Sequence, residues 1–313
     1  MSKRIVVLLM TFTIILLTAC GNKTLKNAQT AVENYNNEIS SYNEKISPFN
    51  EAVQKIIDAN QALDDHIAII QASIDKSGPP YDIETKQILN ENITKAQESK
   101  AIAPEKLPLF VELEIDENAN NDDLKLVIEK SEEDIAVMVS TAVPKVPDVP
   151  DYTKVIEDVE EKYSEYQVSV QRLKQISAPP DDFVISRLKR IDTILEIEAV
   201  SEGNDPNGQL NKQGGYIGCI YFSDKQVDKS KLFIEIDSVI EIATDGGGAI
   251  EIFKTVAEAK TRETYLAAFD GGFLSSGSHH VLGTVLIRTS RELTASQQNE
   301  LTQKIIDVLL DVE

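Results

Sequence analysis

The sequence contains no tryptophan, only two cysteines and three histidines among its 313 residues. Without tryptophan it lacks the indole surface on which bound sugar rings usually stack. Basic residues are also scarce, with 31 lysines and arginines against 52 acidic residues and a formal net charge of −21. Nucleic acid is therefore excluded as an expected ligand, because phosphate binding needs a basic surface.

The N-terminus is typical of a secretion signal. A mostly apolar run, residues 5–17, follows Lys3 and Arg4. As a helix this run would span roughly 20 Å against roughly 30 Å of hydrocarbon, which is too short for a permanent membrane span. The next residues, Leu17-Thr18-Ala19-Cys20, resemble the bacterial lipobox. The resemblance implies that residues 1–19 are a signal peptide and that diacylglycerol and acyl chains on Cys20 hold the protein on the extracellular face of the cell membrane.

Cleavage before Cys20 would change both the charge and the cysteine count. Loss of Lys3 and Arg4 leaves 29 basic residues against 52 acidic ones, a formal charge near −23. This excess argues against a body lying flat on anionic lipid. With Cys20 lipidated, Cys219 has no cysteine partner, so we expect the fold to depend on core packing rather than on disulfides.

Residues 25–74 carry an unbroken heptad pattern typical of a coiled coil or helical bundle. Its members are Leu25, Ala28, Val32, Tyr35, Ile39, Tyr42, Ile46, Phe49, Val53, Ile56, Asn60, Leu63, Ile67, Ile70 and Ile74. A single helix of about 50 residues would reach roughly 75 Å, so we expect a rod or stalk rather than one globular core. Pro48 should kink this helix, because proline lacks a backbone donor.

A weaker heptad pattern returns at residues 152–173, and the two helices end alike. Residues 77–82 and 177–182 each contain two prolines and then an aspartate, and they lie 100 residues apart. We interpret this as a duplicated helical hairpin whose returning helices end near Ser99 and Val200. Between the copies we expect a short strand at residues 111–115, a helix covering 124–142 and a stiff extended connector at 144–150.

After residue 200 the pattern changes to that of a mixed domain. Residues 201–215 are rich in glycine, asparagine and aspartate, and we interpret them as a linker. Strand-like runs follow at 216–222, 249–254 and 281–289, with helix-like segments at 256–269 and 295–310. We therefore predict an α+β fold: an antiparallel helical bundle or coiled coil at 20–200, then a small α+β sandwich at 216–313 with its helices on one face.

Residues from about 214 to 313 resemble a C-terminal module of uncharacterised Gram-positive lipoproteins. The segments that carry the resemblance are Thr244–Gly248, Glu258–Arg262, Tyr265–Gly271, Ser276–His279, Gly283–Val285, Arg288–Ser290 and Leu293–Gln298. The resemblance implies a location at the cell surface and supplies no reaction mechanism.

Four features of the sequence resemble parts of chemical sites. Gly246–Gly248 precede a strand instead of opening a helix, which favours a tight turn over a phosphate cradle. His279 and His280 are adjacent, so a strand would point them to opposite faces, and with only His66 besides them we expect no zinc site. Cys219 lies in an apolar run and is interpreted as a buried hydrophobe. The serines around Gly277 lack the spacing of a nucleophile elbow.

Two charged patterns remain. Asp116, Asn118, Asn120 and Asp122 alternate like calcium ligands, but Asn121 and Val127 stand where a calcium hand needs glycine and glutamate. We therefore interpret them as solvated charge. Residues Arg262, Arg288 and Arg291 offer either a clamp for an anion or ion pairs with nearby acids, and the second interpretation is favoured.

The sequence thus predicts a lipid-anchored surface protein that binds a ligand or acts as a scaffold without catalysis. We expect no cofactor and no metal, and a partner that is an extracellular or envelope molecule of unknown identity. Two alternatives stay open: an envelope enzyme, and a stalk that associates with itself through the heptad pattern and Asn60.

Overall fold

The computed structural model describes residues 21–228, 230, 232, 238–272 and 277–312, which fall into two compact units. The helical unit comprises residues 21–66 and 97–154, and the mixed unit comprises residues 67–96 and 155–312. The predicted fold class, helices followed by a small α+β sandwich, is confirmed. The predicted signal peptide and Cys20 lie outside the described residues. No helix in the described part of the chain is both long enough and apolar enough to cross a bilayer.

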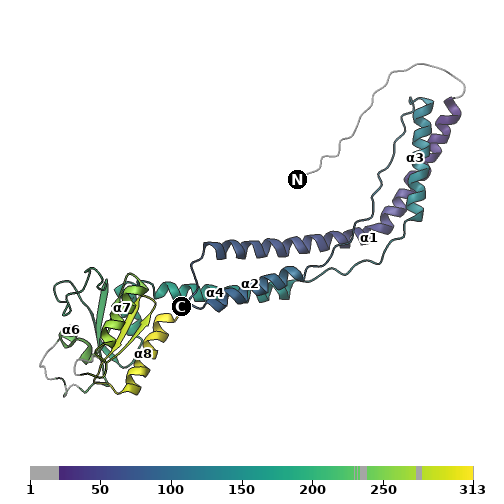
Figure 1. Ribbon diagram of the computed structural model, residues 1–313. Coiled ribbons are helices and arrows are strands. Elements are labelled where there is room, and N and C mark those ends of the chain that lie inside the picture. The colour runs from purple at the N-terminus through teal and green to yellow at the C-terminus, as the bar shows by residue number, and fades with distance from the viewer. Residues whose placement is uncertain (1–20, 229, 231, 233–237, 273–276, 313) are drawn as a thin grey trace. The chain divides into compact units, whose positions relative to one another are not determined.

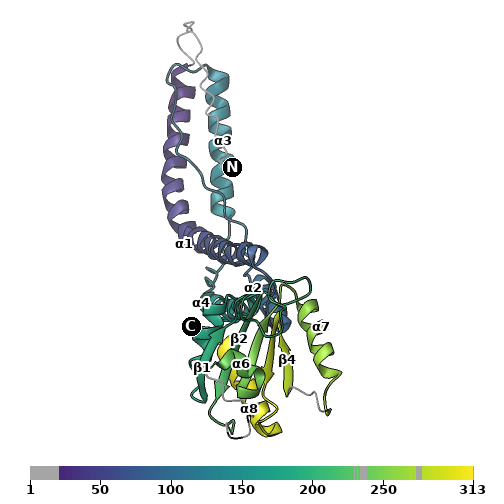
Figure 2. The same cartoon turned by 90° about the vertical axis from the view of Figure 1, so that its left-hand side faces the viewer.

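The helical unit is built on the long helix α1 (Gly21–Lys76), whose final turns belong to the mixed unit. The second helix of this unit, α3 (Asn121–Ser140), lies beside the first part of α1 (Figure 1). The predicted heptad positions from Ala28 onward are buried except Asn60, which is partly exposed. Four of them pack with Met138 of α3: Tyr35, Ile39, Tyr42 and Ile46. The helix continues through Pro48 and changes direction along its length (Figures 1 and 2).

An extended segment, residues 101–116, runs antiparallel to α1 and is held by asparagine side chains of that helix. We call Asn36, Asn43, Asn50 and Asn60 the asparagine row. At Asn36 and Asn50, the side-chain Oδ1 accepts a hydrogen bond from one backbone N–H and Nδ2 donates to the carbonyl of the same residue, with distances of 2.8–3.0 Å. Those residues are Leu113 and Leu107. Asn43 donates to the carbonyl of Phe110 at 3.3 Å.

The strand predicted at residues 111–115 is therefore wrong. The segment is extended, as its apolar and β-branched residues indicate, but its backbone groups bond to the side chains of Tyr35 and Asn36 instead of a neighbouring strand. Backbone groups that leave water need partners from some source. Here the helix surface supplies them.

Asn60 joins two extended segments to α1. Its Nδ2 donates to the carbonyl of Ala101 at 2.8 Å, and its Oδ1 accepts from the Tyr152 hydroxyl at 2.6 Å. The same hydroxyl accepts a bond from the Ala101 N–H at 2.7 Å. Asn60, the polar position of the heptad pattern, therefore has hydrogen-bond partners within its own chain.

The predicted proline turn connects the end of α1 to the next helix of the mixed unit. The chain folds back at residues 77–82, and helix α2 (Ile83–Glu98) follows as expected. The turn is fixed by helix α4 (Thr153–Gln175). The backbone N–H groups of Tyr81 and Asp82 donate to the carbonyl and the hydroxyl of Ser169, at 2.9 and 2.8 Å.

The sheet of the mixed unit has five strands in the order β1-β2-β3-β5-β4, and each neighbouring pair is antiparallel. The strands are β1 (Ile194–Ala199), β2 (Gly218–Asp224), β3 (Gly247–Ile252), β4 (Ser278–Leu282) and β5 (Val285–Thr289). The single run predicted at 281–289 is a hairpin, because Gly283 turns the chain at φ +60° between β4 and β5. A side chain at Gly283 would also collide with the carbonyl oxygen of Ile176.

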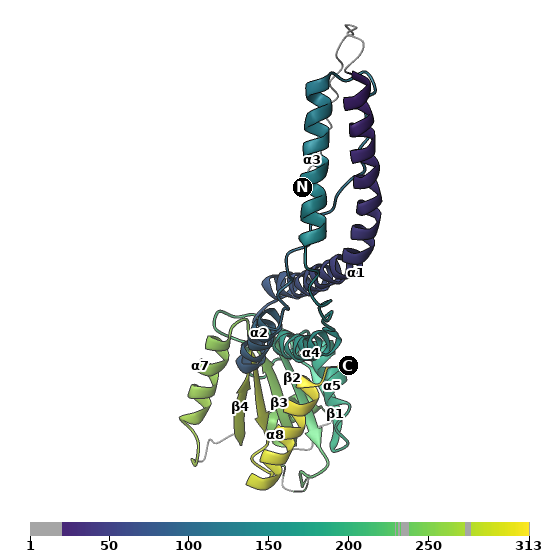
Figure 3. The same ribbon diagram turned by 90° about the vertical axis from the view of Figure 1, so that its right-hand side faces the viewer.

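Helices cover both faces of this sheet, so the prediction of helices on one face is wrong. Helices α5 (Asp181–Leu188) and α8 (Ala295–Leu310) pack on the face that carries Ile220 and Ile250. Helices α6 (Val239–Ile242) and α7 (Val256–Ala267) pack on the face that carries Tyr221 and Ala249. Figure 2 shows α6, α7 and α8 around the sheet, and Figure 3 shows α7 and α8 from the opposite side. The reason is that every residue of β2 and β3 is buried, so both faces need cover.

The second half of the predicted duplication also differs. Helix α5 ends at Leu188, and residues 194–199 form the edge strand β1 instead of a helix reaching Val200. Glu196 and Glu198 alternate with Ile197 and Ala199, a two-residue period that suits a strand. Because β1 pairs with β2, residues 201–215 connect two strands of one sheet rather than two domains.

We predict that Asn50→Leu lowers the free energy of unfolding by about 1–2 kcal/mol, because it leaves the N–H and the carbonyl of Leu107 without their partner. The control Asn37→Leu lies on an exposed position of α1 and should stay within about 0.5 kcal/mol of the parent. Urea unfolding followed by circular dichroism measures both, and equal effects would contradict the role of the asparagine row.

Candidate functional site

The mixed unit contains a cleft of about 480 Å³ on the α7 face of the sheet, which we call the Arg262 cleft. One wall is the loop before β2, through Asn207, Gln209, Gly214, Gly215 and Tyr216. The other wall is α7, through Thr261, Arg262 and Tyr265, and Phe253 completes the lining. The volume lies within the range of small-molecule sites.

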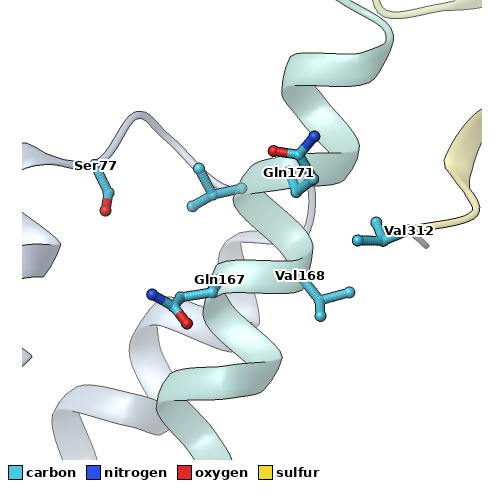
Figure 4. A pocket seen from close by; sticks show the side chains of 6 residues that line it. Ser77, Gln167, Val168, Gln171 and Val312 are labelled. Carbon is cyan, nitrogen blue, oxygen red and sulfur yellow. The ribbon is translucent and has the colours of Figure 1, made fainter.

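A second groove, of about 370 Å³, lies along α4 (Figure 4). It is lined by Ser77, Gln167, Val168, Val170, Gln171 and Val312. Figure 4 shows Gln167 and Gln171 on successive turns of α4, with Val168 and Val312 on the same side of the helix. No charged residue lines this groove, so the Arg262 cleft has the richer chemistry for recognition.

The loop wall of the Arg262 cleft is held by Asp205. Its carboxylate accepts hydrogen bonds from the backbone N–H groups of Asn207, Gln209 and Leu210 and from the hydroxyl of Tyr216, at 2.5–3.0 Å. Burial alone would raise the pKa of Asp205, but these four bonds outweigh it and lower the pKa below its usual range. Leu210 is buried among the side chains of this face, which anchors the loop. The wall is therefore a fixed structure.

The floor beneath α7 contains a buried charged triad. Glu251 on β3 is fully buried, and its carboxylate is held by two guanidinium groups. Arg262 of α7 donates from Nε and Nη2 at 2.9 and 3.2 Å, and Arg288 of β5 donates from Nη1 at 2.7 Å. An ionised carboxylate without partners at this depth would be strongly destabilising. The triad therefore fixes α7 to the sheet and holds Arg262 at the cleft.

Other titratable groups on this face are kept in one protonation state. Burial, reinforced by the charge of Glu251, raises the pKa of the Cys219 thiol well above its usual range. Burial also raises the pKa of Tyr216 and Tyr221, and the bond to Asp205 raises that of Tyr216 further. At neutral pH these three groups are therefore protonated and Asp205 is ionised.

The three arginines singled out in the sequence form ion pairs, as favoured there. Arg262 and Arg288 share Glu251, while Arg291 contacts Asp245 at 3.2 Å and Glu292 at 3.4 Å. Arg288 is not among the lining residues, and Arg262 is. The three do not converge on one point as a clamp would require.

The two histidines of β4 lie in different surroundings. Nε2 of His279 lies 3.1 Å from a carboxylate oxygen of Asp270, while His280 is exposed. Across the described ranges of the chain, no three His, Cys, Asp or Glu side chains are grouped so as to hold a metal ion. Cys219 is a free, buried cysteine, which confirms its interpretation as a buried side chain.

The glycine run and the acidic loop have structural roles. A side chain at Gly248 would collide with the carbonyl oxygen of Arg288 and with the ring of Phe222, so this glycine permits close strand packing. Asn120 caps the N-terminus of α3 by accepting bonds from the N–H groups of Asp122 and Asp123. Asp116 accepts from the N–H of Asn118 at 2.9 Å. These oxygens hold a turn and a helix end.

Sequence reasoning missed Glu251 and the loop residues Asn207 and Tyr216. Glu251 interrupts an apolar strand, and a carboxylate between buried positions is a signal that a cation lies opposite it. The loop offered no comparable signal, because its glycines and asparagines are equally typical of a linker. Comparison with known proteins finds no match among protein-family models, curated proteins or solved structures.

We predict that Glu251→Gln lowers the free energy of unfolding by about 3 kcal/mol or more, because it leaves two buried or half-buried guanidinium groups without a counter-charge. Glu300→Gln is the matched control. Glu300 forms an exposed pair with Lys304, so its loss should cost at most about 0.5 kcal/mol. Chemical denaturation measures the free energy of unfolding of both variants. A loss at Glu251→Gln as small as that of the control would contradict the claim that the triad fixes α7 to the sheet.

Proposed function

We propose that this chain is a lipid-anchored protein of the extracellular face of the cell membrane, and that its mixed unit binds an envelope or extracellular molecule without changing it chemically. The location is supported by the basic residues, the apolar run and the lipobox resemblance at Leu17–Cys20. The net charge of −21 supports a partner other than nucleic acid.

The observation that carries the binding role is the protonation of the groups around the Arg262 cleft. An acid or base catalyst works best with a pKa near the working pH. Asp205, Tyr216, Tyr221 and Cys219 all have pKa values displaced away from neutrality, in the direction that keeps each in one state. Of these groups Tyr216 lines the cleft, and Arg262 beside it is already held by Glu251, which favours recognition over proton transfer.

The anchor is tested by Cys20→Ala. Metabolic labelling with a palmitate analogue should mark the parent and fail to mark this variant, which should also leave the membrane fraction. Cys219→Ala is the matched control, because it removes the buried cysteine and should keep both the label and the membrane association. Label retained by Cys20→Ala, or lost with Cys219→Ala alone, would refute the anchor.

The binding role is tested by affinity isolation of the full chain with envelope extracts of the producing cells. We expect an envelope component to be retained and to keep its mass after prolonged incubation with the protein. Mass spectrometry checks both points. A retained component that is cleaved or modified would identify an enzyme, and the retention of nothing would count against binding.

A further inference from the structure

We propose that the Arg262 cleft binds small organic anions, with carboxylate or phosphate oxygens held by the guanidinium of Arg262 and an apolar body resting on Tyr265. This inference rests on the proposed binding function and names the chemical class of its ligand. Four properties of the cleft support it: charge, free donors, a fixed wall and aromatic lining.

The charge of the cleft is opposite to that of the chain. Among the residues that line it, Arg262 is the one charged side chain, in a protein whose formal charge is −21. The triad beneath contains two guanidinium groups and one carboxylate, so it keeps one positive charge in excess. The Nε of Arg288 is buried and has no hydrogen-bond partner among the described residues. The triad by itself is thus left with an excess of positive charge.

Asp205 does not line the cleft, although its ionised carboxylate offsets part of this positive charge through its bond with Tyr216. The carboxylate of Asp205 contacts the lining residue Tyr216. Its oxygens accept hydrogen bonds from the Tyr216 hydroxyl and from three backbone N–H groups. An anion entering the cleft therefore meets the Tyr216 side of this bond and the guanidinium of Arg262.

Arg262 retains donors for a second anion. A guanidinium carries five N–H donors in one plane. Glu251 takes the edge formed by Nε and Nη2, at 2.9 and 3.2 Å. The edge formed by Nη1 and the second hydrogen of Nη2 has no hydrogen bond to the described residues, and such an edge matches two oxygens of a carboxylate or phosphate. The side chain is 19 % exposed and its guanidinium carbon lies 5.5 Å from the ring centroid of Tyr265, which holds its position.

The walls are formed before any ligand arrives. The loop is fixed by Asp205 and by a bond from the Asn211 N–H to the carbonyl of Tyr216, at 2.8 Å. A side chain at Gly215 would collide with the carbonyl oxygen of Gln209, so the backbone itself forms this wall. A preformed site loses less conformational entropy on binding.

The aromatic lining selects the body of the ligand. Tyr216 and Phe253 pack edge to face with ring centroids 6.3 Å apart, and Tyr265 stands on the α7 side. Tyr216 and Phe253 are each 1% exposed, so the ring of Tyr265, which is 57% exposed, offers the surface against which a flat apolar group can pack. Together with a volume of about 480 Å³, this fits an anion attached to a ring or a short chain better than an inorganic ion.

The test titrates benzoate, phenyl phosphate and benzamide against the full chain in a neutral detergent, observed by saturation-transfer NMR of the ligands. We expect saturable binding of at least one anion at millimolar concentration, with benzamide much weaker because it lacks the charge. Comparison of benzoate with phenyl phosphate distinguishes the two oxygen chemistries. Equal binding of benzamide and the anions, or no binding of either anion, overturns the proposal.

The variants Thr261→Glu and Thr264→Glu test whether the anion binds in the cleft. Both threonines are exposed on α7 and their hydroxyls donate to the carbonyl four residues before them, but only Thr261 lines the cleft. Thr261→Glu should raise the dissociation constant of the bound anion about threefold to tenfold by charge repulsion, and Thr264→Glu should change it much less. Equal weakening by both variants overturns the proposal.

The anion class of the ligand and the proposed binding function can fail independently of each other. An envelope component that is retained unchanged while benzoate and phenyl phosphate fail would leave the binding role intact and refute the anion class. Anion binding to the cleft with a cleaved envelope component would instead refute the non-catalytic role and keep the ligand class.

Discussion

The buried carboxylate of Glu251 is the constraint on which the mixed unit depends. Both faces of the central strands are covered, so a charge on β3 cannot reach water and must be neutralised inside the protein. Arg288 does this from the neighbouring strand and Arg262 from helix α7. One carboxylate thereby sets the position of α7 against the sheet. It also takes one edge of the Arg262 guanidinium and leaves the other edge without a hydrogen bond to the described residues.

The helical unit solves a comparable problem with neutral groups. Its segment 101–116 is extended but has no strand beside it, so its amides and carbonyls need partners from elsewhere. The asparagine row supplies them, since a side-chain amide carries both donors and an acceptor, and those of Asn36 and Asn50 each pair with the N–H and the carbonyl of a single residue. In both units a polar group that leaves water is matched by side chains fixed on helices or strands.

The periodic elements were predictable from the sequence, and the pairings between distant segments were not. The heptad pattern located α1, and Thr294 located the start of α8, where it forms a capping box with Gln297. Strand β1 was missed because the preceding proline turn resembled an earlier helix start, although Glu196 and Glu198 mark a two-residue period.

The candidate site was predictable only in part. Arg262 and Arg288 were recognised as residues that pair with acids, but no local pattern selects Glu251 among 52 acidic side chains. The loop wall was missed because hydrogen bonds to Asp205, which no composition reveals, make an ordered structure from residues typical of a linker.

The spacing of the asparagine row also couples two lengths of chain. Asn36, Asn43 and Asn50 are seven residues apart, and their partners Leu113, Phe110 and Leu107 are three apart. Seven helical residues rise about 10.5 Å, and three extended residues cover about 10 Å. These two lengths are nearly equal, so the pairing of the asparagines with the extended segment is kept only if the helix and the segment lengthen together. A viable insertion here would add one heptad to α1 and one triplet to the segment, and the rod would lengthen in steps of about 10 Å.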